Sequence, residues 1–210
     1  MPEGTVHSEL LRRPGKLYVL ASHFHPDHFN KEVLQWREQR PDIIYIFSKD
    51  ILRHRRAQKE DAVWLKKGEE YKDETLSVRA FGSTDVGVSF LLQAGGKKIF
   101  HAGDLNNWHW MDESIEAEWK GAEKNFLHEL DDLYAYTPEV DVAMFPVDPR
   151  LGKEYMRGAG QFVTKIKTHI FVPMHFTPEY AKANAFRDFA EAHGVRFVSL
   201  THRGQKIEIE

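Results

Sequence analysis

The sequence predicts one α/β domain built from short apolar strands and amphipathic helices. The chain has 210 residues, of which 41% are hydrophobic and 12% aromatic, and this is enough for one sizeable core. Short apolar runs bounded by turn residues recur along it, and one long segment repeats apolar residues at spacings of three and four. Because we find no linker, repeat or low-complexity tract, we expect residues 1–210 to form a single domain.

Composition narrows the class of protein. The chain has no cysteine, so disulfides and thiolate metal sites are excluded. Its net charge of −3 gives no general attraction to nucleic acid, and we expect no nucleic-acid partner. No apolar run approaches the roughly 18 to 20 residues of a membrane span, and the N-terminus has no apolar signal core. We therefore expect no membrane association and a cytoplasmic location.

The first half of the chain alternates strands with short helices. Residues 16–22 form an apolar run after Pro14 and are predicted to be a buried strand. Asn30 is a suitable cap for a helix that Pro41 ends, residues 43–47 read as a strand, and Ser48 caps a second helix. Four strands are then expected at 62–65, 75–81, 87–93 and 97–101, with a turn at 94–96, as a meander in one layer of a sandwich.

The second half begins with a helix predicted over residues 111–134. Its proposed buried stripe consists of Ile115, Trp119, Ala122, Phe126, Leu130 and Leu133, and His128 should face solvent. A strand at 140–147, a short helix from Gly158 through Lys167 and a strand at 169–174 follow. Residues 178–194 read as a helix, and 195–200 and 205–209 as closing strands.

The chemistry concentrates in residues 23–28, His-Phe-His-Pro-Asp-His, directly after the first predicted strand. Imidazole nitrogen and carboxylate oxygen are the ligands of hydrolytic zinc-type sites. A single histidine is more often a surface or core residue than a ligand. Burying these four ionisable groups together without a cation, however, costs several kcal/mol. Alternation along the loop directs His23 and His25 to one position and Asp27 and His28 to a second, which predicts two adjacent metal ions.

This pattern after a strand resembles the signature of the metallo-β-lactamase superfamily. Residues 99–104, ending in Gly103-Asp104, and residues 172–176, with His175, resemble two further landmarks of that family in the same order. In the residues around these motifs, the sequence looks most like a branch of metal-dependent hydrolases related to sugar-phosphate lactonases. The resemblance implies an αββα sandwich. It also implies a hairpin before the first histidine, where this sequence shows one strand, so either a strand pair is missing or the sheet is smaller. A missing hairpin would leave a sheet edge open to a partner, so an oligomer is one option.

By the same resemblance, His23 and His25 serve a first metal, Asp27, His28 and His175 serve a second, and Asp104 bridges them. The cofactor would be one or two divalent ions, zinc in the first instance with manganese or iron as alternatives. A hydroxide generated on the metals would attack a carbonyl or phosphorus, and Asp27 and Asp104 are the catalytic carboxylates.

One departure from the family pattern stands out. The family supplies a third histidine to the first metal before a Gly-Ser pair, and this chain has Phe81 before Gly82-Ser83. Three outcomes follow: a single metal at the second position, a substitute ligand such as Asp85 or His109, or a fold that has lost catalysis. His101 is expected to support the site rather than bind metal.

Substrate-binding candidates are Trp108, Arg150 and Arg157. Trp108 and Trp110 either form a wall over the site or cap the core, and the two arginines flank a glycine-rich helix start that could bind phosphate or carboxylate. The function expected is a hydrolase of a small anionic ester, a lactone or phosphodiester. The alternative is a non-catalytic metal- or ligand-binding module. An RNA nuclease is disfavoured because the chain is not basic.

Overall fold

The computed structural model describes residue 6 and residues 8–208. The helices and strands, in chain order, are α1 Ser8–Leu11, β1 Tyr18–Ala21, η1 Lys31–Glu38, β2 Ile44–Ser48, α2 Lys49–Arg53, η2 Lys59–Asp61, β3 Val63–Leu65, β4 Glu70–Lys72, β5 Ser77–Phe81, β6 Ser89–Ala94, β7 Lys97–His101, α3 Glu116–Tyr136, β8 Glu139–Pro146, η3 Pro149–Glu154, α4 Arg157–Lys165, β9 Lys167–Met174, α5 Tyr180–Asn184, α6 Arg187–Ala192 and β10 Arg196–Phe197.

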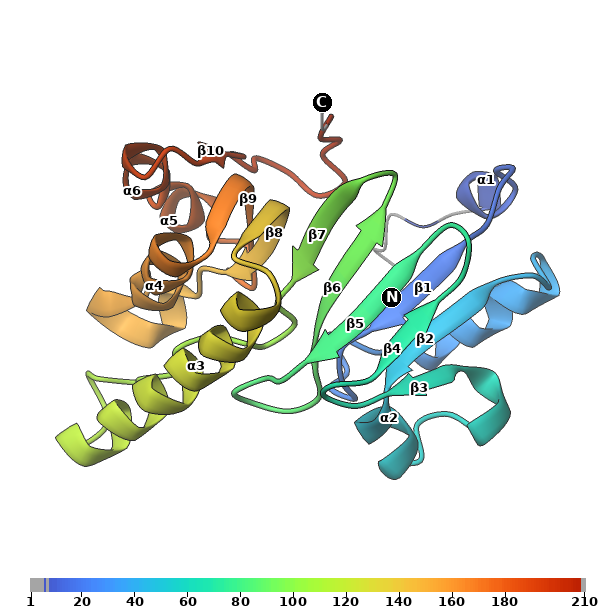
Figure 1. Ribbon diagram of the computed structural model, residues 1–210, viewed down its shortest axis with the longest axis horizontal. Coiled ribbons are helices and arrows are strands. Elements are labelled where there is room, and N and C mark those ends of the chain that lie inside the picture. The colour runs from blue at the N-terminus through green and yellow to red at the C-terminus, as the bar shows by residue number, and fades with distance from the viewer. Residues whose placement is uncertain (1–5, 7, 209–210) are drawn as a thin grey trace.

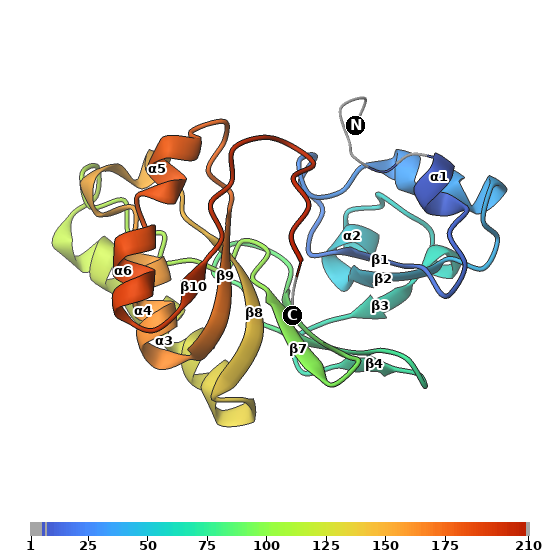
Figure 2. The ribbon, with the colours of Figure 1, turned by 90° about the horizontal axis from the view of Figure 1, so that it is seen from above.

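These strands form two sheets packed face to face. The smaller sheet has the order β1-β2-β3 and is parallel throughout. The larger has the order β10-β9-β8-β7-β6-β5-β4, with an antiparallel meander from β4 to β7 and parallel pairing from β7 to β10. Helices α1 and α2 lie outside the smaller sheet and α3 to α6 outside the larger (Figures 1 and 2). The predicted α/β sandwich, with two β layers and helices on both outer faces, is confirmed.

The core follows this layering. Ile46 of β2 packs between the sheets with Val78 and Phe90 of the meander. The outer face of the larger sheet is covered by α3, through Phe126 and Leu130, and by α4 to α6. Apolar burial of roughly 25 cal/mol per Å² on these faces is what holds the layers together.

The smaller sheet has three strands and covers only part of the larger one. On β8 and β9, Val142, Ile170 and Val172 are covered instead by the C-terminal segment, which contributes Val198. Figure 2 shows this segment running between the two halves of the sandwich. One strand, β1, precedes the histidine loop in the described residues, and it is an edge strand of the smaller sheet.

Several predicted helix boundaries were wrong. The helix expected from residue 111 starts at Glu116, because Ser114 donates its hydroxyl to the carbonyls of His109 and Trp110 and holds residues 109–114 in a turn. Ile115 is consequently 66% exposed and lies outside the buried stripe. His128 is exposed, as predicted. The short helix ends at Lys165, since Lys167 already donates its N–H to Pro138 at the start of β9.

Two predictions for the C-terminal part of the chain, one long helix and a last strand, were wrong. The helix expected over 178–194 is two helices, α5 and α6, with buried Phe186 between them packed against Phe171 and Phe197. Residues 205–208 form no strand, because the Gln205 side chain bonds the backbone of Ser199 and Thr201 and closes a turn. Residue 209 lies outside the described residues. Four short elements, α1, η2, β4 and η3, were not predicted. The strand expected at 62–65 was wrongly assigned to the meander, because β3 pairs with β2 in the smaller sheet.

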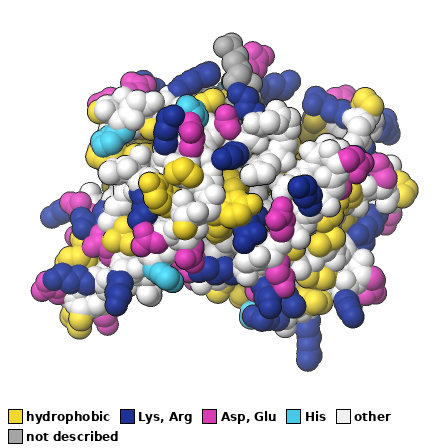
Figure 3. All heavy atoms as spheres, in the orientation of Figure 1, with side chains coloured by type: hydrophobic (Ala, Val, Ile, Leu, Met, Phe, Trp, Pro, Cys, Tyr) yellow, Lys and Arg dark blue, Asp and Glu magenta, His cyan; other side chains and the backbone are white. Residues whose placement is uncertain are grey.

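The surface is mixed in charge. On the face shown in Figure 3, basic and acidic side chains are interspersed, in keeping with the small net charge. Among the described residues, no helix is both long enough and apolar enough to cross a membrane.

Candidate metal centre

The histidine loop leaves β1 through a tight turn. His28 and Phe29 donate their backbone N–H groups to the carbonyl of His25, at 3.0 and 2.8 Å, and Phe24 donates its N–H to the carboxylate of Asp50 on α2 at 3.0 Å. The turn brings the His23 and His28 rings to a centroid separation of 4.1 Å. Local sequence therefore places several ligand-type side chains together before any contact with the other sheet.

The larger sheet supplies Asp104 and His175. Each follows the carboxyl end of a strand, β7 and β9, and both strands run parallel to β8 between them, so their ends meet at one edge of the sheet. Gly103 before Asp104 has a φ of 56° and lies against Ser22, where a Cβ would be 2.9 Å from the Ser22 side chain. His175 itself has a φ of 62°, a strained conformation for a non-glycine residue.

Asp104 lies between two groups of imidazoles. Its Oδ2 is 3.4 Å from Nε2 of His23, and its Oδ1 is 3.1 Å from Nε2 of His28 and 3.4 Å from Nε2 of His175. Two sets of possible metal donors result, each with its atoms within 4.8 Å of one another. One set is His23, His25 and Asp104, and the other is Asp27, His28 and His175. The structure thus brings together all six residues that the sequence proposed as ligands.

Neighbouring groups orient two of these rings. The Ser22 hydroxyl lies 3.1 Å from Nδ1 of His23, and the carboxylate of Asp148 lies 2.9 Å from Nδ1 of His175. In both rings Nδ1 is engaged and Nε2 is turned toward Asp104. A partner on one nitrogen fixes the tautomer and leaves the other nitrogen to bind metal.

Burial and charge shift the pKa values in the centre. Burial lowers the pKa of His23 to about 4, against the opposing effect of Asp104, and it also lowers the pKa of His28. Burial alone would lower the pKa of His175, but the neighbouring carboxylates of Asp104 and Asp148 outweigh it and raise the pKa to about 9. His23 and His28 are therefore neutral at pH 7, the form that binds a metal.

Unpaired polar atoms show that the centre fits a metal. Nε2 of His23 and Oδ1 of Asp104 are buried without a hydrogen-bond partner among the described residues. Leaving such atoms unpaired costs about 1–3 kcal/mol each, and a cation between them would remove that cost. Imidazole nitrogen with carboxylate oxygen matches the donors of zinc, manganese and iron sites.

The centre opens into a cavity of about 350 Å³. The cavity is lined by His25, Asp27, Thr84, Asp85, Asp104, Trp108, Trp110, Arg150 and His175. The ring of Trp108 meets the ring of His175 edge-on, with the two centroids 5.4 Å apart. The rings of Trp108 and Trp110 are stacked, with their centroids 6.4 Å apart. Of the two alternatives for these tryptophans, the structure has the wall over the site.

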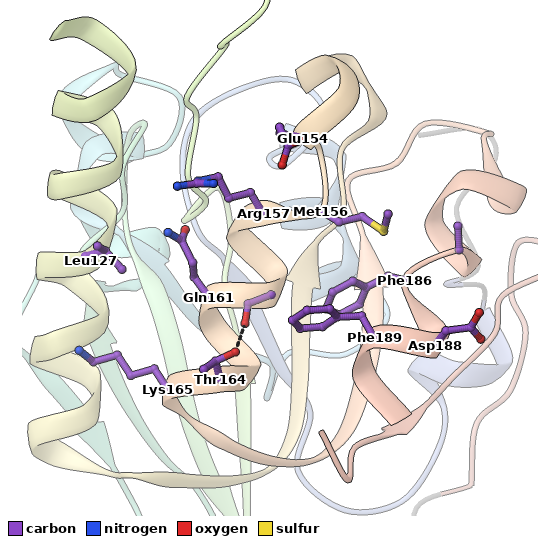
Figure 4. Close-up of a pocket in the computed structure, with 12 residues that line it drawn as sticks. Leu127, Glu154, Met156, Arg157, Gln161, Thr164, Lys165, Phe186, Asp188 and Phe189 are labelled. Atoms are coloured by element: carbon purple, nitrogen blue, oxygen red, sulfur yellow. Dashed lines mark hydrogen bonds between the residues drawn. The ribbon is translucent and has the colours of Figure 1, made fainter. Parts of the chain in front are cut away.

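The two candidate arginines lie in different places. Arg150 lines the cavity, and its guanidinium pairs with the fully buried carboxylate of Asp148. Arg157 lines a separate groove between α3, α4 and α6 on the outer face of the larger sheet (Figure 4). Its Nε donates to Glu123 at 2.7 Å. The structure does not bring Arg157 to the metal centre.

Residues around the expected third histidine are engaged elsewhere. Phe81 is buried in the core between the larger sheet and its helices, and a Cβ on Gly82 would lie 2.0 Å from the carboxylate of Glu129.

His109 is buried with Nε2 against the Glu154 carbonyl, and His101 accepts a hydrogen bond from Gly103 N–H. His109 is therefore not a substitute ligand. Asp85 faces the donor set of His23, His25 and Asp104, with its Oδ2 3.7 Å from Nδ1 of His25.

Asp148 and Ser22 were not identified from the sequence. The position of Asp148 just after β8 was a usable signal, because β8 lies between the strands that carry Asp104 and His175. Ser22 gave no such signal, since a serine at a strand end has many structural roles.

The family can now be assigned. A family model described as beta-lactamase superfamily domain matches residues 7–176. The chain belongs to this superfamily. A search of curated proteins found no match.

Several solved structures share the fold of this chain at low sequence identity. The metallo hydrolase Igni18 of the archaeon Ignicoccus hospitalis has 18% identity and a TM-score of 0.60, over 88% of this chain and 76% of that one. Zn²⁺-bound PqqB of Methylobacterium extorquens has 16% identity and a TM-score of 0.51, over 87% and 70%. The diiron β-hydroxylase CmlA of Streptomyces venezuelae has 14% identity and a TM-score of 0.58, over 90% of this chain but only 44% of that chain. At these identities the likeness establishes the fold alone.

Proposed function

We propose that this superfamily member is a metal-dependent hydrolase of a small anionic ester, a lactone or a phosphodiester. The observation that supports it most is Asp104, whose two carboxylate oxygens face different imidazole groups. That arrangement suits a carboxylate shared by two cations. A single metal ion would occupy one of the two donor sets and leave the other set without a ligand role.

The bound ions, zinc in this proposal with manganese or iron as alternatives, would supply Lewis acidity and lower the pKa of a water toward ~7. His23, His25 and Asp104 would hold the first ion, and Asp27, His28 and His175, with Asp104, the second. Asp27 is exposed toward the cavity, with Oδ2 3.5 Å from Nε2 of His28. It can therefore also accept a proton from a water beside the second position.

The cavity supports a small, negatively charged substrate. Its volume of about 350 Å³ is at the lower end for small-molecule sites. Arg150 offers its guanidinium at the cavity wall, where it can bond a phosphate or carboxylate. Trp108 and Trp110 provide flat apolar surface and keep water from that side.

The second candidate is a non-catalytic metal- or ligand-binding protein. The packing of Phe81 and Gly82 favours it, because neither position can accept an imidazole without displacing the outer core or Glu129. Turnover is what separates the two candidates, since both bind metal.

The test compares metal content and turnover in wild type, Asp104→Asn and the double variant His23→Ala/His25→Ala. A chromogenic phosphodiester and a simple lactone serve as substrates. Metal polarisation is worth several kcal/mol, and each 1.4 kcal/mol is tenfold, so we expect rates to fall about 100-fold or more in both variants. Asp131→Asn, an exposed carboxylate of α3 paired with Lys165, is the control. Metal bound at full content without turnover of any ester above free metal would favour the non-catalytic candidate.

A further inference from the structure

The loop between β5 and β6 carries a carboxylate beside the first donor group. Oδ2 of Asp85 lies 3.7 Å from Nδ1 of His25. Two donors each about 2.1 Å from one tetrahedral ion are about 3.4 Å apart, so this separation is close to that of two ligands of a single metal. The same value, 3.4 Å, separates Nε2 of His23 from Oδ2 of Asp104.

The backbone on both sides of Asp85 is held against the metal loops. The Thr84 hydroxyl donates to the carbonyl of Asn106 at 2.5 Å and accepts from its N–H at 3.0 Å. On the other side, Gly87 lies so close to the histidine loop that a Cβ would be 2.1 Å from the carbonyl oxygen of Ser22. The position of Asp85 is therefore fixed relative to both loops that supply the first group.

The Asp85 side chain has room to reach that group. It is 44% exposed and lines the cavity together with His25 and Asp104. The donors within 4.8 Å of one another are His23, His25 and Asp104. In the proposed function Asp104 is shared with the second position, so within this set only the two imidazoles serve the first position alone. Rotation of the Asp85 side chain would bring its carboxylate to this set as a further donor.

Resting on the proposed function, we propose that Asp85 is the fourth protein ligand of the first metal position. The site then has two imidazole nitrogens and two carboxylate oxygens. Oxygen donors favour harder cations, so this position should take manganese or iron more readily than one with three imidazoles. The carboxylate of Asp85 then takes the place of the imidazole that the family has before the Gly-Ser pair, so the first site keeps four protein ligands.

The experiment measures metal equivalents per chain by elemental analysis after the metal-free protein is loaded with Zn²⁺ or with Mn²⁺. Wild type should hold two equivalents and Asp85→Ala one. Asp85→His restores a donor and should return the content toward two, with a higher ratio of zinc to manganese retained than in wild type. Asp188→Asn, an exposed carboxylate on α6 away from the centre, is the matched control and should match wild type.

Two results would overturn the assignment while leaving metal-dependent hydrolysis in place. One is Asp85→Ala holding two equivalents with unchanged affinity in competition with a chelator. The other is wild type holding a single equivalent that Asp85→Ala leaves unaffected. Wild type that retains neither cation would instead refute the proposed function, and the assignment of Asp85 with it.

Discussion

The carboxylate of Asp148 accepts a hydrogen bond from Nδ1 of His175 at 2.9 Å, across 27 residues of sequence. Asp148 is fully buried at the end of β8, while His175 ends the neighbouring strand β9. The contact turns Nε2 of His175 toward Asp104. Arg150 donates to the same carboxylate through Nε and Nη2, so the ring, the acid and the guanidinium form one connected unit.

Asp148→Asn should weaken metal binding at the second position about 10- to 100-fold, because an amide supports the imidazole less well than a carboxylate. Competition with a chromogenic chelator measures the affinity. Asp141→Asn changes a carboxylate on the same strand that accepts a hydrogen bond from Lys98 N–H and lies away from the centre. Equal losses in the two variants would mean that Asp148 acts through the stability of β8 alone.

Arg150→Ala should raise KM for an anionic ester about tenfold or more, because a hydrogen bond to a charged group is worth about 1.5–3 kcal/mol. Arg157→Ala should leave KM unchanged, since Arg157 pairs with Glu123 outside the cavity. Steady-state kinetics with an anionic and a neutral ester of similar size measures the difference. A rise of equal size for the neutral ester would count against a charge-specific role for Arg150.

Gly87→Ala should destabilise the fold more than Gly95→Ala. Both glycines have positive φ, at 77° and 57°, so both substitutions carry left-handed strain of about 1–2 kcal/mol. A Cβ at position 87 also meets the carbonyl oxygen of Ser22 at 2.1 Å, whereas nothing lies within 4 Å at position 95. Overpacking adds about 1–3 kcal/mol. Urea unfolding measures both, and equal losses would show that the loop gives way.

Asp73 predicts a pH dependence of stability. Burial alone would raise the pKa of its carboxyl, but backbone N–H groups, the Tyr18 hydroxyl and Lys16 bond it and hold its pKa well below the usual range. A folded-state pKa below the unfolded value, about 3.9, adds stability above that pH, and this is lost as the pH falls. Asp73→Asn should therefore lower the melting temperature at pH 7, with the gap from wild type shrinking below about pH 4.

Thermal unfolding at pH 7, 5 and 3 checks this dependence. Asp188→Asn again serves as the control, because it removes an exposed carboxylate elsewhere and should change the melting temperature little at any of these pH values. A gap for Asp73→Asn that stays constant down to pH 3 would contradict the argument. Tyr18 on β1 and Tyr71 on β4 both donate to Asp73, so the same data report on contact between the two sheets.

Much of the centre was accessible from sequence because its first part is local. His23, His25, Asp27 and His28 fall in one turn, whose geometry is set by residues within six positions of one another. The strand runs before Asp104 and His175 were also readable, since apolar runs bounded by turn residues mark buried strands. Their meeting at one sheet edge followed from parallel pairing with β8.

Helix limits and partners across the chain were not accessible in this way. The side-chain hydrogen bond of Ser114 moves the start of α3 to a later residue than the pattern predicts. The two arginines near a glycine-rich helix start looked equivalent in the sequence. In the structure Arg150 lies beside His175, whereas Arg157 pairs with Glu123. The sequence by itself determined most strands and helices, the donor types and the local ligand loop, because short-range spacing and hydrophobic pattern encode them. Only the tertiary structure decided that Asp148 supports His175 and that Asp85 faces His25, because those contacts depend on how separate strands and loops are brought together.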